Sequence, residues 1–235
     1  MVRTGNRPAA AALRLAIDPH APSHRVIAKA ASVLREGGLV AFPTDTLYAL
    51  GADVTNRCAL MRLFATKGRS RATPIPVLVA DLAMATRMVG SLPEAANRLA
   101  ERYWPGPLTL VLSAPRAISR LLTAGTGRIG LRVPDAPAAI ALILRLGGPV
   151  TGTSANRSGG RAPRDADEVL RQLGDRIDLI LDGGPIPAGS PSTVVDVTVS
   201  PPVIVRKGVV QQKEILTLLA VRSPRETPDA VLERS

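Results

Sequence analysis

The sequence predicts a mixed α/β domain, and three observations support this class. Short apolar runs alternate along the chain with longer segments in which apolar side chains recur every three to four residues. Glycine and proline mark the ends of most of these segments. No internal repeat or Ser/Gly-rich linker divides the 235 residues. We therefore expect one domain in which helices cover a sheet, with enough chain to bury a sizeable core.

The first predicted helix spans Arg25 to Glu36, because its apolar side chains lie on one face and Gly37-Gly38 ends the pattern. A buried strand, Leu39 to Phe42, follows. The next helix begins at Asn56, whose side chain is suited to capping a helix N-terminus.

The remaining helices and strands are predicted in the same way, from the spacing of apolar residues and from the Gly, Pro or capping residues at their ends. Further strands are predicted at Ile75–Ala80, Leu108–Leu112, Ile129–Val133, Pro149–Thr153, Leu179–Leu181, Thr193–Val197 and Val203–Arg206. Further helices are predicted at Leu82–Val89, Glu94–Arg102, Pro137–Leu146, Asp165–Leu173 and Ile215–Ala220.

Both ends of the chain are predicted to be flexible. Residues 1–12 are rich in Arg and Ala and contain no acid, so we expect a mobile tail there, with a transit peptide as the alternative. Residues 221–235 are rich in Pro and charge and are expected to be frayed. The folded domain is expected to span residues 13–220.

The composition excludes several classes of protein. No apolar run approaches the ~20 residues of a membrane-spanning helix. Cys58 is the only cysteine, and His20 and His24 are the only histidines, so a Cys/His zinc site and His-dependent hydrolases are disfavoured. The chemistry must use Lys, Arg, Asp, Ser, Thr, Asn and backbone amides, and we expect no metal site built from side chains.

The charge of the chain indicates an anionic partner. Thirty Lys and Arg residues against nineteen Asp and Glu give a formal net charge of +11, which favours a nucleotide or a nucleic acid. The alternative is a bias of genome composition, since Ala, Arg and Gly are all abundant. Aromatic residues make up only 2% of the chain, so a platform for stacking unpaired bases is disfavoured, while contact with tRNA phosphates stays open.

Two polar clusters follow the first predicted strand and the second helix. In the first, Thr44, Asp45 and Thr46 offer two hydroxyls and a carboxylate, which suggests a socket for an amine and a hydroxyl group; the alternative is a turn that satisfies its own amides. In the second, Lys67 supplies a point charge and Arg69 a planar fork for phosphate oxygens. The alternative there is a cationic helix C-terminus favoured by the helix dipole.

Further polar clusters lie at the ends of later strands. Residues 151–160, Thr-Gly-Thr-Ser-Ala-Asn-Arg-Ser-Gly-Gly, suggest a loop that binds an anion or a sugar, or otherwise a simple connector. The loop has neither the P-loop nor the Rossmann glycine spacing. Ser192, Arg206 and Arg132 lie at other strand ends, where each is either a solvated residue or part of a triphosphate pocket.

Taken in order, these clusters resemble the YrdC-like family, the threonylcarbamoyladenylate synthases. The resemblance spans Leu13 to Gly208. It rests on Pro-Thr-Asp-Thr, Lys-x-Arg, Trp-Pro-Gly-Pro-Leu-Thr at 104–109, Leu-Arg-Val-Pro, Thr-Ser-Ala-Asn, Ser-Thr-Val-Val-Asp and Val-Arg-Lys-Gly. The chain lacks the extra C-terminal domain of the longer family members, so it resembles the short, single-domain TsaC type. Ala49, Ser70 and Arg164 depart from the family pattern, which usually has Gly, Pro and a hydroxyl residue at these positions.

The resemblance implies a fold and a reaction. It implies an α/β (α+β) fold with an open, twisted mixed sheet, surrounding helices and a concave basic cavity, which makes residues 13–220 a YrdC-like catalytic domain. It also implies a nucleotidyltransferase that condenses L-threonine, bicarbonate and ATP into threonylcarbamoyladenylate and releases pyrophosphate. Mg²⁺ is expected to arrive with the triphosphate. A partner transferase complex would then modify tRNA beside the anticodon, in the cytoplasm and without a membrane.

The resemblance also implies roles for particular residues. Those of the Lys-x-Arg and Ser-x-Asn motifs would be catalytic, namely Lys67, Arg69, Ser154 and Asn156. The expected ATP contacts are Arg69, Thr109, Asn156 and Arg206. The expected threonine contacts are Thr46, Ser154, Ser192 and, as a weaker match, Ser113.

Three other interpretations compete with this one, and the sequence disfavours the second of them. A non-catalytic protein that binds double-stranded RNA or tRNA fits the net charge. The carbamoyl-transfer domain of hydrogenase maturation proteins is a relative, but it belongs to a much longer, zinc-containing chain, for which this sequence has neither the length nor the cysteines. A paralogous ATP-dependent carbamoylating enzyme that acts on another amino acid is the third.

Overall fold

The computed structural model describes residues 12–186 and 189–220, in which the strands form two mixed sheets. The first sheet has the order β1-β9-β2-β3-β8, with β1 (Leu13–Ala16), β9 (Leu179–Asp182), β2 (Val40–Phe42), β3 (Ala49–Gly51) and β8 (Thr153–Ser154). The second has the order β11-β10-β5-β6-β4-β7, with β11 (Val203–Arg206), β10 (Thr193–Asp196), β5 (Leu108–Ser113), β6 (Arg128–Arg132), β4 (Val77–Leu78) and β7 (Val150–Thr151).

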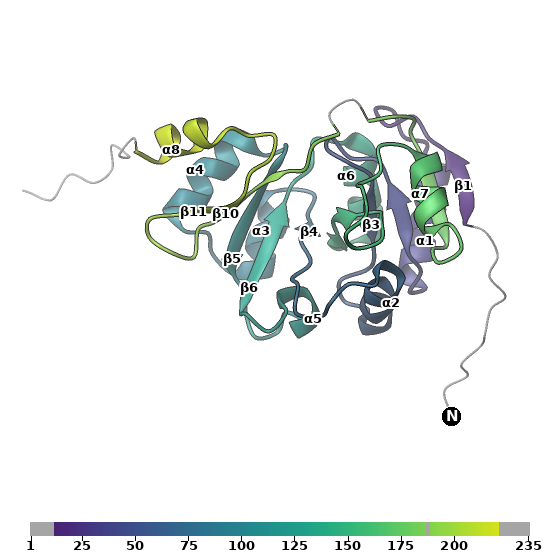
Figure 1. Ribbon diagram of the computed structural model, residues 1–235, viewed down its shortest axis with the longest axis horizontal. Helices are drawn as coiled ribbons and strands as arrows, with labels where there is room; N and C mark the ends of the chain where they lie inside the picture. Colours follow the sequence, from purple (N-terminus) through teal and green to yellow (C-terminus); the bar gives the residue numbers. More distant parts are fainter. Residues whose placement is uncertain (1–11, 187–188, 221–235) are drawn as a thin grey trace, which may run out of the picture.

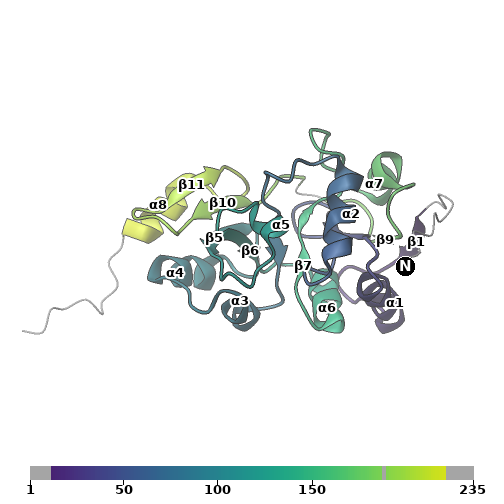
Figure 2. The ribbon, with the colours of Figure 1, turned by 90° about the horizontal axis from the view of Figure 1, so that it is seen from below.

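Helices surround both sheets, as Figure 1 shows. They are α1 (His24–Arg35), α2 (Arg57–Lys67), α3 (Leu82–Val89), α4 (Glu94–Tyr103), α5 (Arg120–Thr123), α6 (Pro137–Leu146), α7 (Ala166–Leu173) and α8 (Gln212–Ala220). In Figure 2, α4, α3, α6 and α1 form a row along one side of the molecule, where α1 packs on α6. None of the helices in the described residues is long and apolar enough to cross a membrane. The predicted α/β class is confirmed, with its strands divided between two sheets.

Burial follows the position of each strand in its sheet. All residues of the inner strand β2 are buried, and β9 is buried at three of its four residues, so both appear as continuous apolar runs in the sequence. The edge strands β1 and β11 are largely exposed. The inner strands therefore hold the core, and the polar segments that follow them are free to line a site.

The chain passes from one sheet to the other at Gly152. The sequence predicts one strand over Pro149–Thr153, but the structure has β7 in the second sheet and β8 in the first. A Cβ on Gly152 would lie 2.5 Å from the Leu78 side chain, so only glycine permits this close approach. The crossing brings the ends of strands from both sheets to the same place.

Other differences from the predicted elements have local causes. Strand β4 is shorter than the predicted Ile75–Ala80, since Pro74 and Pro76 cannot donate ladder hydrogen bonds. Strand β3 and the short helix α5 were not predicted. The predicted cap is confirmed, because the Asn56 side chain accepts a hydrogen bond from the Ala59 amide at 3.0 Å.

The predicted flexible tails lie outside the described residues, apart from Ala12. That residue is buried, and its amide donates a hydrogen bond to the Gly174 carbonyl at 2.7 Å.

Candidate active site

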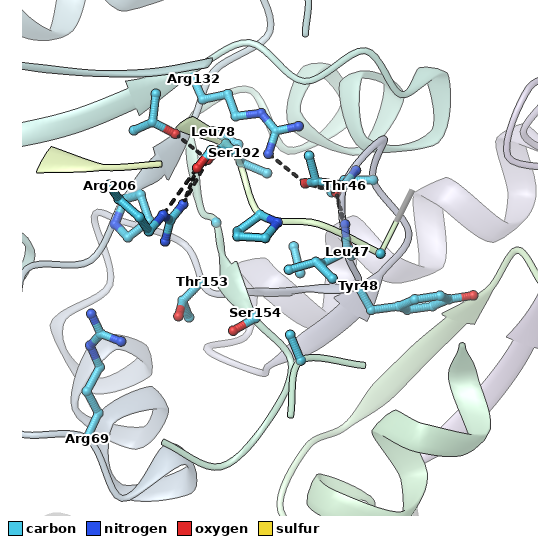
Figure 3. Close-up of a pocket in the computed structure, with 18 residues that line it drawn as sticks. Thr46, Leu47, Tyr48, Arg69, Leu78, Arg132, Thr153, Ser154, Ser192 and Arg206 are labelled. Atoms are coloured by element: carbon cyan, nitrogen blue, oxygen red, sulfur yellow. Dashed lines mark hydrogen bonds between the residues drawn. The ribbon is translucent and has the colours of Figure 1, made fainter. Parts of the chain in front are cut away.

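A pocket lies where the two sheets meet. Its walls come from the segment between β2 and β3, from β8, and from β4, β5, β6 and β11 of the second sheet. Six of the residues expected from the sequence line it together: Thr46, Arg69, Thr109, Ser154, Ser192 and Arg206. Figure 3 shows Arg132 and Thr46 on one side of this hollow and Arg206 and Arg69 on the other. The residues come from sequence positions more than 150 apart, so the fold itself assembles the site.

One end of the pocket is built around Arg132, the last residue of β6. Its guanidinium donates hydrogen bonds to the Gly106 carbonyl at 2.9 Å and to the Thr46 hydroxyl at 2.8 Å, and forms an ion pair with Asp45. Burial lowers the pKa of Arg132, and the charge of Asp45 opposes that shift. Every nitrogen of this side chain is thus engaged, and its orientation is fixed.

The contact of Asp45 corrects an expectation from the sequence. The Thr-Asp-Thr cluster suggested a socket in which this carboxylate receives an amine. Instead Asp45 Oδ1 pairs with Arg132, while Oδ2 is enclosed and has no hydrogen-bond partner among the described residues. Because Asp45 follows the strand and turns back toward β6, it neutralises Arg132 rather than facing the pocket.

The opposite end of the pocket carries Arg206, the last residue of β11. Its guanidinium donates to the Ser192 carbonyl at 2.8 and 3.1 Å and to the Ser192 hydroxyl at 3.0 Å. That hydroxyl shares a buried hydrogen bond of 2.9 Å with Thr109. Arg206 of β11, Ser192 just before β10 and Thr109 of β5 therefore form one connected group.

Arg69 completes the cationic wall from the end of α2. Gly68 adopts a left-handed conformation with φ of 60° and ends the helix, so Arg69 turns away from the helix and toward the pocket. Its guanidinium donates to the Pro74 carbonyl at 2.8 Å. The alternative interpretation, a cationic helix C-terminus, does not explain the orientation of Arg69, because α2 ends two residues earlier, at Lys67.

The pocket has a strongly positive field. Three arginines line it, and no acidic side chain of the described residues does. Arg132 is neutralised by Asp45, but within residues 12–186 and 189–220 neither Arg69 nor Arg206 forms an ion pair. Partial withdrawal from solvent lowers the pKa of Arg206, and the charges of Arg132 and Arg69 lower it further. This end of the pocket is therefore prepared for anionic oxygens.

Lys67 lies behind the pocket wall rather than in it. Its side chain is buried, and the ammonium donates to the carbonyls of Ser154 and Asn156 at 2.5 and 2.7 Å. Burial, aided by the charge of Arg69, lowers the pKa of Lys67 to about 7. In this conformation Lys67 does not contact the hollow, and it ties α2 to the loop that carries Ser154.

Asn156 holds the same loop from behind. Its amide nitrogen donates to the carbonyls of Arg157 and Gly160 at 2.9 and 2.6 Å, which directs its oxygen toward Ser154. The Ser154 hydroxyl donates to that oxygen at 2.5 Å. Asn156 is buried and does not line the pocket, whereas Ser154 does.

Ser113 is placed elsewhere. It is the exposed last residue of β5, opposite Arg128, and the pocket lies at the Thr109 end of the same strand. At about 3.3 Å per residue, four residues of strand separate the two by about 13 Å. We therefore remove Ser113 from the candidate threonine contacts.

Several pocket residues were not among the site residues expected from the sequence. They include Tyr48, Leu78 and Arg132, of which Arg132 was expected only as a further cation at a strand end. Thr44, part of the predicted polar cluster, also lines the pocket. The Tyr48 ring points away from the hollow, and its hydroxyl donates to the Gly184 carbonyl at 2.8 Å. For Arg132 the available signal was its position, since it is the last residue of β6. The apolar Leu78 carried no sequence signal for a site.

Comparisons with known proteins show which family and fold the chain is similar to. The sequence profile of the Sua5/YciO/YrdC family, described as "Telomere recombination", matches residues 32–208. The threonylcarbamoyl-AMP synthase of Bacillus subtilis is 42% identical over 190 residues, which cover 80% of this chain and 55% of that protein. The chain thus spans about half the length of the first curated relatives it matches.

Two solved structures are similar in fold. The crystal structure of P. abyssi Sua5 complexed with L-threonine matches with a TM-score of 0.85 and 36% identity, and covers 88% of this chain and 61% of that one. The crystal structure of E. coli YciO matches with a TM-score of 0.80 and 31% identity, and covers 87% and 99% of the two chains.

Proposed function

The chain belongs to the Sua5/YciO/YrdC family, and from that premise we propose that it makes L-threonylcarbamoyladenylate from L-threonine, bicarbonate and ATP. Pyrophosphate is the other product. The enzyme is then a nucleotidyltransferase that activates an N-carboxylated amino acid as a mixed anhydride with AMP.

The observation that carries this proposal is the division of the pocket into two ends of different character. Arg69 and Arg206, which form no ion pair with any described residue, offer positive charge that suits a triphosphate. Arg132 keeps two N–H groups beyond those that Gly106, Thr46 and Asp45 take, and these suit the carboxylate of an amino acid. The Thr46 hydroxyl donates to Thr44, so toward a ligand its oxygen is an acceptor. The two ends share one hollow, so the pocket fits a nucleotide and an amino acid side by side.

The proposed reaction needs no covalent enzyme intermediate. The amine of threonine takes up the carbon of bicarbonate to form a carbamate, and a carbamate oxygen attacks the α-phosphorus of ATP. The bond from the α-phosphorus to the bridging oxygen breaks, and pyrophosphate leaves with the electron pair. Such a step depends on the placement of reactants and on cations that stabilise charge on phosphate oxygens.

We assign roles by position in the pocket. Thr46, Ser154 and Ser192 are the proposed threonine contacts, joined by Arg132. Arg69, Thr109 and Arg206 are the proposed ATP contacts. Lys67 and Asn156 support the site from behind its wall, since their hydrogen bonds hold the backbone and hydroxyl of Ser154.

Mg²⁺ is proposed only as a counter-ion that arrives on the triphosphate. No carboxylate of the described residues lines the pocket, so the side chains present do not fit a resident metal. The expected consumer of the product is a transferase complex that passes the threonylcarbamoyl group to tRNA. That role places the protein in the cytoplasm, where tRNA and ATP are found, and leaves room for direct contact with tRNA phosphates.

The test is a product assay on the purified chain. The protein is incubated with ATP, L-threonine and bicarbonate, and the products are followed by mass spectrometry together with release of pyrophosphate. We expect a species with the mass of threonylcarbamoyladenylate, which disappears when any one substrate is omitted. An assay with boiled protein controls for the uncatalysed reaction.

The same assay separates the alternatives. A non-catalytic RNA-binding protein releases no pyrophosphate under any condition. The similarity to E. coli YciO, whose protein is described as uncharacterised, keeps a paralogous enzyme in view. Such an enzyme would release pyrophosphate with an amino acid other than threonine, and a panel of amino acids would reveal this.

A further inference from the structure

The side chain of Thr44 decides where the proton of Thr46 points. The two hydroxyl oxygens lie 3.1 Å apart, so one of them donates to the other. Thr44 has a single side-chain proton, and it gives this proton to the Leu47 carbonyl at 2.6 Å. Thr46 is therefore the donor of the pair, and Thr44 is the acceptor.

Thr44 is itself held by the turn that it closes. Its oxygen accepts hydrogen bonds from the amides of Thr46 and Leu47, both at 3.2 Å. A threonine hydroxyl that bonds to the backbone two or three residues later is a common way to fix a turn. Thr44 is buried, and its proton and lone pairs are all taken, so it offers no hydrogen bond of its own to a ligand.

The bonds of Thr46 leave one lone pair for the pocket. Arg132 donates to the Thr46 oxygen at 2.8 Å, as Figure 3 shows. A hydroxyl has one proton and two lone pairs. With the proton on Thr44 and one lone pair on Arg132, a single lone pair remains, and Thr46 lines the pocket. Toward a ligand Thr46 is thus an acceptor whose polarity is fixed in advance.

Ser154 is an acceptor of the same kind on another side of the hollow. It gives its proton to the Asn156 side-chain oxygen at 2.5 Å, and the nitrogen of that amide already donates to two carbonyls. In Figure 3 Thr46 lies at the Arg132 end of the pocket, while Ser154 lies on the side that faces Arg69.

These positions divide the donor groups of the amino acid between the two acceptors. The nitrogen must react beside the triphosphate, for which Arg69 and Arg206 are the proposed contacts, so it belongs on the Ser154 side. The side-chain hydroxyl, one carbon further from the reacting nitrogen, then falls to Thr46, beside the carboxylate that Arg132 is proposed to hold.

We propose that Thr44 is a positioning residue that presets Thr46 as the acceptor for the side-chain hydroxyl of the amino-acid substrate. The inference rests on the proposed function, and it adds the residue that selects for a proton on the β-hydroxyl. That proton completes a chain of hydrogen bonds in one direction, from the substrate to Thr46, to Thr44 and to the Leu47 carbonyl. Thr44 acts through Thr46.

Such a chain distinguishes a donor from an acceptor of the same size. A hydroxyl whose proton is free can rotate and serve either kind of group, whereas Thr46 with its proton committed serves only donors. Fluorine is close to a hydroxyl in size but has no proton. The 3-fluoro analogue of L-threonine, in which fluorine replaces the hydroxyl, therefore places a group without a donor against the Thr46 lone pair and leaves that lone pair unpaired.

The first experiment uses the parent protein. Values of kcat/KM from pyrophosphate release are compared for L-threonine and the 3-fluoro analogue, with ATP and bicarbonate present. A site built to bind a hydroxyl rejects an analogue without it, and because Thr46 keeps two other hydrogen bonds we expect a preference for threonine of about 10²-fold. A preference below about tenfold overturns the proposal.

The variant Thr44→Val tests the role of Thr44 itself. Without the Thr44 oxygen the Thr46 proton can turn to the fluorine, so the preference for threonine should fall to about tenfold or less. Thr44→Ser keeps the hydroxyl and should keep the preference of the parent protein. Thr44→Ala, which also lacks the hydroxyl, takes the place of Thr44→Val if that variant does not fold.

The preference separates positioning from general damage to the turn. A turn that is merely loosened lowers kcat/KM for both amino acids and leaves their ratio unchanged. An unchanged ratio in Thr44→Val, or a ratio that falls equally in Thr44→Ser, overturns the proposal.

Thr126→Val is the matched control. The Thr126 hydroxyl also donates to a backbone carbonyl, that of Thr123, at 2.7 Å, and accepts from the Arg128 amide at 3.2 Å, but Thr126 does not line the pocket. The ratio should be that of the parent protein. A fall as large as in Thr44→Val would mean that the loss of any turn hydroxyl has this effect, and the proposal would be wrong.

Failure of this inference is distinct from failure of the proposed function. If threonine supports formation of threonylcarbamoyladenylate but Thr44→Val keeps the ratio of the parent protein, the function stands and the role of Thr44 falls. If no amino acid supports pyrophosphate release in the parent protein, the proposed function itself falls.

Discussion

Arg132 and Arg206 reach the same pocket, yet the protein holds them in different ways. Arg132 is almost fully buried, with an acid, a hydroxyl and a carbonyl each taking one of its nitrogens. Arg206 is exposed at the pocket mouth, and in the part of the chain that the structure describes it is held by the carbonyl and hydroxyl of Ser192 alone. One arginine is part of the framework, while the other keeps its charge for a ligand.

The difference between Arg132 and Arg206 shows how a basic pocket can be rigid and still bind anions. A buried guanidinium without an acid would be costly, so Asp45 accompanies Arg132. At the mouth, solvent reduces that cost, and Arg206 and Arg69 remain without acidic partners among the described residues. Loss of a framework cation should therefore affect folding first, and loss of a free cation should affect binding first.

The largest expected effect comes from Arg132→Met. It leaves the Asp45 carboxylate buried without its partner, which costs about 3–5 kcal/mol for a broken buried pair. We expect the free energy of unfolding, measured by urea denaturation, to fall by this amount. The double variant with Asp45→Asn should recover part of the loss.

Arg128→Met is the control for this prediction. Arg128 also pairs with an acid, Asp196, at 2.9 Å, but its side chain is 48% exposed. Such a pair contributes about 0–1 kcal/mol. Equal losses in the free energy of unfolding would mean that the buried pair of Arg132 and Asp45 stabilises the fold no more than the exposed pair of Arg128 and Asp196.

Next in size is the effect of Arg206→Met on catalysis. Removal of one cation that stabilises phosphate charge should lower kcat/KM for ATP by about 10²-fold, with the free energy of unfolding nearly unchanged. Lys207→Met, which removes the neighbouring exposed charge, serves as the control and should have a small effect. A stability loss as large as that of Arg132→Met would remove the distinction between the two arginines.

The sequence predicted the fold well where the hydrophobic periodicity and the residues that end helices and strands indicated the same boundaries. Helices α3 and α6 have the predicted bounds, because glycine, proline or a capping residue borders each apolar pattern. Strand β3 was missed, since its three residues lie inside a motif interpreted as a polar loop. The division of Pro149–Thr153 between two sheets depends on the close contact of Gly152 with Leu78. This is a tertiary contact, which the local sequence does not predict.

The candidate site was predicted in part for similar reasons. Residue type, together with a position beside the end of a strand or, for Arg69, of a helix, indicated the residues that the fold brings together: Thr46, Arg69, Ser154, Ser192 and Arg206. Type alone does not say whether a cation faces a pocket or the loop behind it, and Lys67 faces the loop. The partner of a buried carboxylate is likewise set by packing, so an amine socket at Asp45 was the wrong expectation.

Lys67 extends the comparison to a third cation, which is buried like Arg132 but has no ion pair with an acid in residues 12–186 and 189–220. Its pKa is lowered from 10.5 to about 7, mainly by burial. Between these values the unfolded chain binds more protons than the folded one, so the free energy of unfolding should rise with pH above about 7. The slope from this group is at most about 1.4 kcal/mol per pH unit.

Denaturation at several pH values tests this slope. Lys67→Met should flatten the rise, whereas Lys207→Met, at an exposed site, should leave it as in the parent protein. The same slope in all three proteins would mean that Lys67 stays charged in the folded state. A nearby acid would then be needed to explain how the buried charge is stabilised.

The smallest effect is expected at Ser113, which lies outside the pocket. Ser113 and Ser192 are both serines expected from the sequence to contact threonine, but Ser192 is buried beside Arg206 and Ser113 is exposed at the far end of β5. Ser113→Ala should change the KM for threonine by less than about twofold and stability by less than about 0.5 kcal/mol, as for other surface substitutions. Ser192→Ala should raise that KM severalfold, because Arg206 and Thr109 both lose the hydroxyl that connects them. Steady-state kinetics on the two variants measures both KM values. An equally large rise in the KM for threonine in both variants would mean that the amino acid contacts Ser113 as well as Ser192.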